Sequence, residues 1–185
     1  SFPTRRSSDL HGKQLSVPVS VAEDAKSTVL RAWRIPPFEE ELARELDPVD
    51  FVMPDGTKLS LGPERFAVCE PSWNGPGGLA AAVHASLEAL DPDLRRAQAQ
   101  DVVVVGGASL LDGLGERLGK DLADLLPNAF KPRVAAPGSR TERQFATFVG
   151  GSVLASLGTF QQLWLSKREW DEVGPRRAVE ERFIH

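Results

Sequence analysis

The sequence predicts an α/β fold, and three observations support this. Four consecutive valines at 102–105 indicate a buried strand. Apolar residues recur at helical spacing before this strand, at 79–90, and after it, from 112 onward. Hydrophobic residues make up 41% of the 185 residues and charged residues 26%, a balance typical of folded globular domains. A helix, a strand and a second helix in this order favour α/β architecture.

The first fifty residues are expected to be mainly helical. Residues 22–34 carry small and apolar side chains on roughly one side, which is typical of an amphipathic helix. These side chains are Ala25, Val29, Ala32 and Trp33. Pro36 and Pro37 would end this helix, because proline lacks the backbone N–H and clashes with the preceding turn. A second, shorter helix is expected at 38–46.

A β-hairpin is predicted next. Pro54, Asp55 and Gly56 form a strong turn signal, since proline presets φ and glycine accepts positive φ. The flanking segments 51–53 and 58–61 are expected to form its two short strands.

Two amphipathic helices frame the valine strand. The first is expected at 79–90, before Asp91-Pro92, and the second from about Asp112 to a stop at Pro127. Their apolar positions are Leu79, Val83, Leu87 and Leu90 in the first and Leu114, Leu118, Leu122 and Leu125 in the second. A further short strand is expected at 133–135.

The C-terminal part is predicted to be helical again. Ser166 and Glu169 have the spacing of a capping box, in which the serine oxygen accepts from the N–H of the glutamate. Gly174 and Pro175 would end that helix, and a last short helix is expected at 176–183. The glycine pair at 150–151 is expected to let another element pack closely against a helix.

Composition excludes several classes of site. The net charge is −4, which argues against a nucleic-acid surface, because phosphate binding needs clustered Lys and Arg. The single cysteine, Cys69, permits no internal disulfide and no thiolate metal site. The three histidines lack the spacing of metal ligands. No apolar run approaches the roughly 20 residues that cross a bilayer.

The best local candidate for chemistry is VVVVGGAS at 102–109. A strand that ends in two glycines before a helix allows a ligand to approach the backbone, and free N–H groups there favour an anion. A tight turn is the commoner meaning of such a pattern. Neither a pair of carboxylates for acid/base work nor a nucleophile beside a base is evident, and His84 is expected to be a partly exposed helix residue.

Three stretches resemble the actin family. They read FVMPDGTKLSLGPERF at 51–66, LDPDLRR at 90–96 continued by DVVVVGGASLLDGLGERLGKDLADLLP at 101–127, and RTERQFATFVGGSVLASLGTFQQLWLSKREWDEVG at 140–174. The resemblance implies an actin/Hsp70-like ATPase fold, present in part as the large-lobe subdomain with some of the insertion subdomain. It implies a partial helical insertion subdomain at 11–50 and a C-terminal actin-like domain at 51–185. Residues 1–10 resemble translated sequencing-adapter DNA and are expected to be non-native.

Within the family, RTERQF, SLGTFQQ and AVEERF resemble the nuclear class called actin-related protein four. This class implies an interaction subunit of chromatin-remodelling or histone-acetyltransferase complexes in the nucleus. Its expected partners are actin and a helical segment of a remodelling ATPase or scaffold subunit, with no direct sequence-specific nucleic-acid contact and no membrane. The alternative is a conventional or cytoskeletal actin-like ATP-binding protein that polymerises in the cytoplasm. A degenerate gene product without a stable fold of its own is a third interpretation.

The resemblance assigns cofactor-binding residues for ATP. Gly106 and Gly107 match the glycines that contact the nucleotide in actins. The set is completed by the four positions that follow them, by two positions near the adenine and by the residue after one of these two. The others are Ala108, Ser109, Leu110, Leu111, Lys26, Gln144 and Phe145. Leu111 replaces an aromatic residue and Gln144 a lysine, so ATP is expected to bind weakly or not at all. No catalytic and no metal residue is assigned, because the catalytic half of actins, which organises Mg²⁺, corresponds to sequence upstream of this chain.

A partner-binding role is implied for Phe160, Leu163 and Trp164. In actins the equivalent region helps to line an apolar cleft where partner helices dock. Internal packing is the alternative explanation for Phe160 and Trp164. We also expect a partly uncovered apolar face at 149–164, with a tendency to aggregate.

Overall fold

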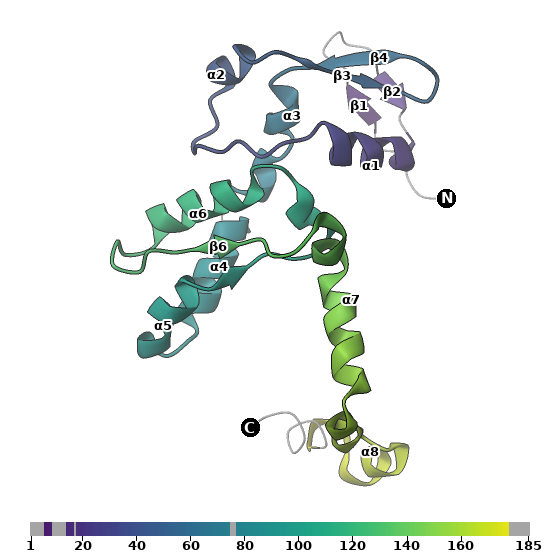
Figure 1. Cartoon of the computed structure of the whole chain (residues 1–185), viewed down its shortest axis with the longest axis vertical. Coiled ribbons are helices and arrows are strands. Elements are labelled where there is room, and N and C mark those ends of the chain that lie inside the picture. The colour runs from purple at the N-terminus through teal and green to yellow at the C-terminus, as the bar shows by residue number, and fades with distance from the viewer. Residues whose placement is uncertain (1–5, 9–13, 17, 75–76, 178–185) are drawn as a thin grey trace. The chain divides into compact units, whose positions relative to one another are not determined.

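The computed structural model describes residues 6–8, 14–16, 18–74 and 77–177, in two compact units, Ser1–Gln144 and Phe145–His185 (Figure 1). The helices are α1 Val19–Thr28, α2 Glu40–Arg44, α3 Glu64–Ala67, α4 Leu79–Glu88, α5 Pro92–Ala99, α6 Leu114–Leu125, α7 Arg140–Ser156 and α8 Lys167–Val173. Short 3₁₀ segments are η1 Glu70–Ser72, η2 Gly107–Leu110 and η3 Gly158–Leu163. The strands are β1 Arg6–Ser8, β2 Gln14–Ser16, β3 Val49–Val52, β4 Lys58–Leu61, β5 Val102–Val103 and β6 Val134–Ala135. The proposed domain boundary at 50/51 falls inside β3 and stays a prediction.

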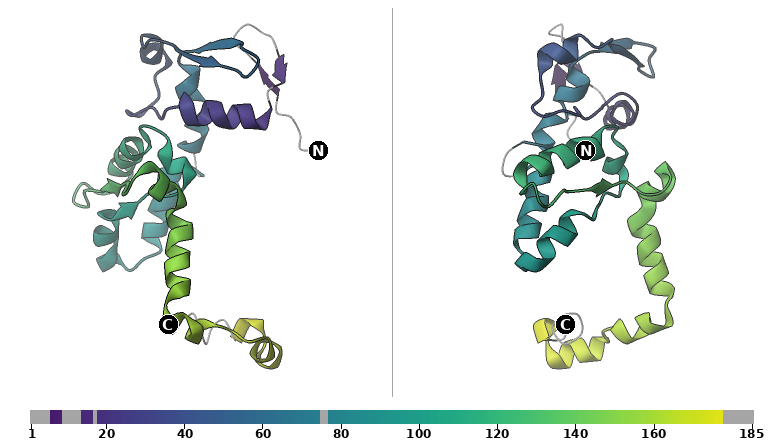
Figure 2. Two further views of the ribbon diagram at one scale, coloured as in Figure 1. Left: turned by 45° about the vertical axis from the view of Figure 1, so that its right-hand side comes forward. Right: turned by 60° about the vertical axis from the view of Figure 1, so that its left-hand side comes forward.

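The predicted hairpin is confirmed. Strands β3 and β4 pair antiparallel, with Val49 opposite Leu61, and lie in the same part of the first unit as α1 and α3 (Figure 2). Gly56 has φ 83°, a left-handed conformation that glycine adopts without strain. The Oδ1 of Asp55 accepts from the N–H of Thr57 at 2.9 Å, which closes the turn.

The first helix is shorter than the sequence pattern predicts. Helix α1 ends at Thr28, so the helix expected as far as residue 34 was wrong over its last turns. Beyond α1, the N–H of Arg31 donates to the carbonyl of Arg65 at 3.2 Å, and the N–H of Ala32 donates to that of Asp112 at 2.8 Å. These bonds to distant segments replace the helical ones. The second helix of this region is confirmed, with the shorter bounds of α2.

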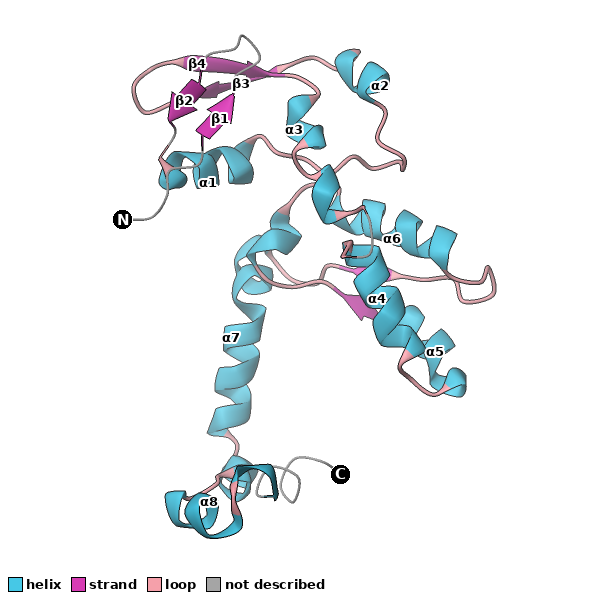
Figure 3. Ribbon diagram, turned by 180° about the vertical axis from the view of Figure 1, so that it is seen from behind, coloured by secondary structure: helices cyan, strands magenta, loops and turns pink. Residues whose placement is uncertain are grey.

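The valine strand is covered on one face only. Strand β5 pairs in parallel with β6, with Val102 opposite Val134. Val102 and Val104 are half-buried and pack against the core, whereas Val103 and Val105 are 51% and 43% exposed. The prediction of a buried strand at 101–105 was therefore wrong in two respects: the strand covers only Val102–Val103, and none of the four valines is fully buried. Helices α4 and α6 pack together beside this strand pair, as Figure 3 shows.

Helix α6 is the centre of the first unit. Leu118 and Leu122 of the predicted leucine stripe are almost fully buried, whereas Leu125, its last member, is 48% exposed. Leu87 of α4 belongs to the same core as Leu118 and Leu122. The predicted helices at 79–90 and from 112 onward are thereby confirmed, as α4 and α6. A buried ion network holds α6 to η1 and to the segment after α1. Arg117, whose side chain is 2% exposed, donates to both carboxylate oxygens of Glu70, at 2.8 and 3.1 Å.

The second unit buries no side chain among its described residues, which end at 177. The uncovered apolar face expected at 149–164 is confirmed, with exposed fractions of 49% to 62%. Its members are Val149, Val153, Leu154, Leu157 and Trp164. The close packing expected at the glycine pair was wrong here, since a Cβ on Gly150 or Gly151 would meet no described atom within 4 Å.

The predicted cap of α8 is confirmed. Ser166 Oγ accepts from the N–H of Glu169 at 3.1 Å, and α8 is followed by Gly174, with φ 84°. Most of the short helix expected at 176–183 lies outside the described residues. In the described part of the chain, no helix combines the length and apolar character needed to cross a membrane.

Candidate nucleotide-binding site

Three segments of the first unit enclose a hollow of about 910 Å³. They are the end of α1 with the residues after it, the turn that contains η2, and the first turns of α7. The lining residues are Glu23, Lys26, Ser27, Leu30, Arg31, Gly107, Ala108, Leu110, Leu111, Asp112, Arg140, Thr141 and Gln144.

The glycine turn forms one wall. Gly106 has φ 88°, and its N–H donates to the carbonyl of Arg143 at 2.9 Å, which ties the end of the valine strand to α7. A side chain at Gly106 would be strained in this left-handed conformation, so the turn requires glycine. The buried Ser109 donates its Oγ–H to the carbonyl of Gly106 at 2.7 Å. Gly107 then begins η2 and lines the hollow.

The first turns of α7 form the second wall, and a capping box fixes the start of this helix. The N–H of Glu142 donates to Ser139 Oγ at 3.3 Å, and Glu142 Oε2 accepts from the N–H of Ser139 at 2.8 Å. These hydrogen bonds from Ser139 hold the pKa of the Glu142 carboxyl below its usual value. The box sets the helix phase that turns Arg140, Thr141 and Gln144 to the hollow.

The third wall joins α1 to the loop before α6. Residues Arg31 and Asp112 form a parallel backbone bridge, and the Nε of Arg31 lies 3.5 Å from Oδ2 of Asp112. Lys26 and Glu23 project from the exposed part of α1. The lining therefore carries three cations, Lys26, Arg31 and Arg140, against two carboxylates.

The structure brings six of the nine predicted cofactor-binding residues to this hollow. They are Lys26, Gly107, Ala108, Leu110, Leu111 and Gln144. Gly106 and Ser109 shape the turn without lining it, and Phe145, 51% exposed, belongs to the second unit.

Sequence reasoning assigned no site role to seven other lining residues. They are Glu23, Ser27, Leu30, Arg31, Asp112, Arg140 and Thr141. The S-x-x-E spacing of Ser139 and Glu142 would have indicated where α7 begins and hence Arg140 and Thr141. No local pattern indicates that Arg31 meets Asp112, because a tertiary bridge joins them.

The size and chemistry of the hollow suit a small anionic ligand with a flat apolar part. Its volume lies in the range of about 300 to 1,000 Å³ that is typical of small-molecule sites. Leucines at positions 30, 110 and 111 supply apolar surface and the cations supply charge. Among the described residues there is no group of three or more metal-ligating side chains.

The predicted partner-binding residues lie in the second unit. The rings of Phe160 and Trp164 meet edge to face, with centroids 6.4 Å apart. Trp164 is 62% exposed, and Phe160 is half-buried. Leu163 ends η3, and its side chain lies outside what the structure describes.

Comparison with known proteins decides the family. The family model described as Actin matches residues 13–184. The chain belongs to the actin family. It therefore has the actin/Hsp70-like ATPase fold, of which these 185 residues are a part.

Curated relatives agree with this. The chain is 37% identical over 174 residues to actin-related protein 4 of Neurospora crassa, which covers 83% of this chain and 37% of the relative. It is 35% identical over 208 residues to actin-related protein 4 of Emericella nidulans, covering 98% of this chain and 43% of the relative. The protein of the same name from Arabidopsis thaliana is 34% identical over 172 residues, with 83% of this chain and 39% of the relative covered. The chain thus spans less than half the length of the curated relatives it matches.

Proposed function

We propose that this chain is part of an actin-related protein that acts as an interaction subunit of nuclear chromatin-remodelling or histone-acetyltransferase complexes. The observation that carries the proposal is the uncovered apolar face of the second unit, which ends at the exposed Trp164 ring. Exposed contiguous apolar surface is typical of protein-interaction sites. A helix from a remodelling ATPase or scaffold subunit, with actin as a further partner, would cover the part formed by Phe160, Leu163 and Trp164.

ATP acts in this proposal as a structural ligand. The hollow beside Gly107 would hold the nucleotide, with Lys26 and Gln144 on its adenine side. Leu111 and Gln144 offer weaker contacts to the base than the aromatic ring and the lysine expected from actins. A ligand that binds only the folded state stabilises it by mass action without being turned over.

Calorimetry with ATP on the full-length protein tests the nucleotide role, with a phosphate-release assay alongside. Saturable binding without steady turnover supports the proposal. Turnover coupled to filament assembly would instead support the alternative, a cytoskeletal ATP-binding protein in the cytoplasm. The glycine turn and the hollow beside it are also consistent with this alternative, because both suit a bound nucleotide.

Partner capture tests the interaction role separately. Full-length protein with Trp164→Ala should lose most of its binding to the helical segment of the remodelling ATPase, since an exposed aromatic anchor is removed. Trp170→Ala is the matched control, because that ring is also exposed, at 43%, but lies outside the proposed set. Equal loss in both variants would contradict the assignment of Trp164.

A further inference from the structure

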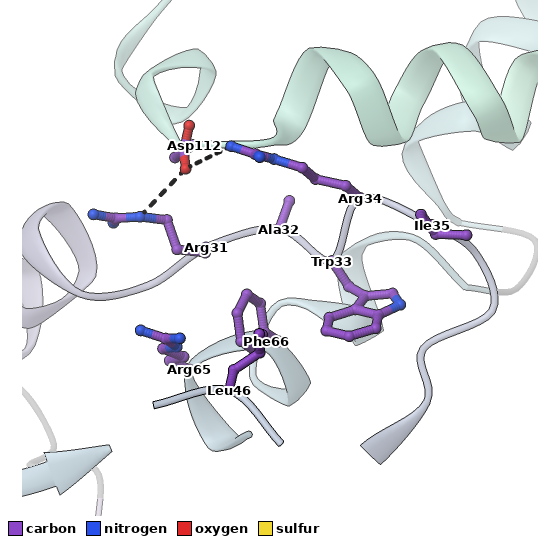
Figure 4. Close-up of a pocket in the computed structure, with 9 residues that line it drawn as sticks. All are labelled: Arg31, Ala32, Trp33, Arg34, Ile35, Leu46, Arg65, Phe66 and Asp112. Atoms are coloured by element: carbon purple, nitrogen blue, oxygen red, sulfur yellow. Dashed lines mark hydrogen bonds and ion pairs between the residues drawn. The ribbon is translucent and has the colours of Figure 1, made fainter. Parts of the chain in front are cut away.

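A second, smaller hollow of about 350 Å³ shares Arg31 and Asp112 with the first (Figure 4). None of the glycine-turn residues lines it, so it is a site of its own. Its other walls come from the extended segment after α1, from the chain after α2, and from α3.

The apolar walls are built from the small Ala32 and four large side chains, Trp33, Ile35, Leu46 and Phe66. The rings of Trp33 and Phe66 meet edge to face with centroids 5.3 Å apart, and Phe66 is only 8% exposed. Ile35 and Leu46 are 63% and 44% exposed, so apolar surface remains open at this hollow. The arrangement offers a fixed aromatic wall and exposed aliphatic side chains to an incoming apolar group.

Cations dominate the polar part of the lining. The lining holds three guanidinium groups, those of Arg31, Arg34 and Arg65, and one carboxylate, that of Asp112, which is an excess of two positive charges. Arg34 Nη2 lies 3.1 Å from Asp112 Oδ2, the same oxygen that Arg31 approaches at 3.5 Å. Figure 4 shows the two guanidiniums on either side of this carboxylate. Outside the lining, Glu116 pairs with the Nε of Arg34 at 3.3 Å.

Arg65 has no carboxylate within ion-pair distance among the described residues. Its guanidinium lies over the ring of Phe66, 4.8 Å from the centroid, and its Nη2 donates to the carbonyl of Asp47 at 3.3 Å. Its buried Nε has no hydrogen-bond partner in the described part of the chain. The chain as a whole has a net charge of −4, so the cation excess here is local.

We propose that this hollow binds an acidic peptide segment that presents one large apolar side chain beside carboxylates. The apolar side chain would enter against Trp33 and Phe66. The carboxylates would pair with Arg34 and Arg65, since guanidinium and carboxylate groups form charge-assisted hydrogen bonds. The volume is near the lower limit of small-molecule sites, which fits a single side chain with its neighbours.

The test uses the full 185-residue chain and the peptide acetyl-Gly-Glu-Phe-Glu-Gly-amide. Binding is followed by NMR at the indole N–H signal of Trp33, identified by its disappearance in Trp33→Phe. We expect a saturable shift of this signal. Arg34→Gln should weaken binding about 5-fold or more, because a charge-assisted contact is lost. Ile35→Ser, at a side chain that is 63% exposed, should weaken it as well.

Matched controls separate the two features of the peptide. Arg44→Gln changes an exposed arginine that pairs with Glu40 outside this hollow, and it should leave the affinity unchanged. A peptide with Gln in place of both Glu residues, and one with Ala in place of Phe, should each bind at least about 5-fold more weakly. No saturable shift with the acidic peptide, equal affinity for the Gln or the Ala peptide, or equal loss in Arg44→Gln and Arg34→Gln would each overturn the proposal.

Discussion

The two units differ in how many side chains of their longest helix they bury. Helix α6 is 12 residues long and buries four side chains, whereas the 17-residue α7 buries none. Both carry apolar residues in their sequences, and both form regular helices. An apolar pattern therefore specifies a face that is stabilised by burial, and no described part of the chain buries the residues of α7.

Among the substitutions considered, removal of the buried arginine of α6 should change the free energy of unfolding most. Arg117→Ala leaves Glu70 and Asp121 without their cation in the interior of the first unit. We expect the free energy of unfolding in urea to fall by about 3–5 kcal/mol, as when one partner of a buried ion pair is lost.

The second unit supplies the control for that variant. Arg168 pairs with Glu172 at 3.4 Å, but its side chain is 86% exposed. Arg168→Ala should change the free energy of unfolding by less than about 1 kcal/mol. Similar losses in the two variants would show that the Arg168 side chain is not exposed to solvent.

Truncation of leucines compares the two helices directly. Leu122→Ala, at a side chain that is 0% exposed, should cost about 2–5 kcal/mol, because it opens a cavity in the core. Leu154→Ala, at 59% exposure, should stay within about 0.5 kcal/mol. Urea unfolding measures both, and an equal cost at Leu154 would mean that its face of α7 is already covered.

Glycine substitutions compare the stability of the backbone in the two units. Gly113 has φ 82°, and a Cβ there would lie 2.8 Å from the carbonyl oxygen of Ala32. Gly113→Ala should destabilise the first unit by about 1–3 kcal/mol through backbone strain and this clash. Gly158→Ala is the control, since a Cβ there would meet no described atom within 4 Å. Thermal melting measures both variants. An unchanged melting temperature of Gly113→Ala would contradict the predicted strain and clash at this position.

The smallest expected effect is a pH dependence at the start of α7. The hydrogen bonds from Ser139 lower the folded-state pKa of Glu142 from 4.5, so the stability that this carboxylate contributes is present above that value. It is lost as the pH falls through the folded-state pKa. The difference in melting temperature between the wild type and Glu142→Gln should therefore be largest near pH 6 and shrink as the pH is lowered below 4.5. A constant difference would exclude ionisation as the cause.

The features that local chemistry determines were predictable. The turn at Pro54–Gly56 and the cap at Ser166 depend on residues within a few positions, and both form as predicted. The predictions for the first helix and for the valine strand were only partly right. Arg31 and Ala32 are bonded to distant segments, and the exposed face of β5 depends on which layers surround it.

The site shows the same division. Residues such as Gly107 and Gln144 followed from a resemblance that covers nearly the whole chain, and both line the hollow. The pair of Arg31 and Asp112 could not be predicted, since a parallel bridge between separate segments brings it together. Local sequence contains no information on that bridge.

Because Arg31 and Asp112 line both hollows, the two cavities share a wall. An occupant of either hollow that displaces this pair changes the shape and charge that the other presents. Thermodynamic linkage then applies: a molecule in one hollow alters the affinity of the other by a given factor, and the reverse influence has the same factor.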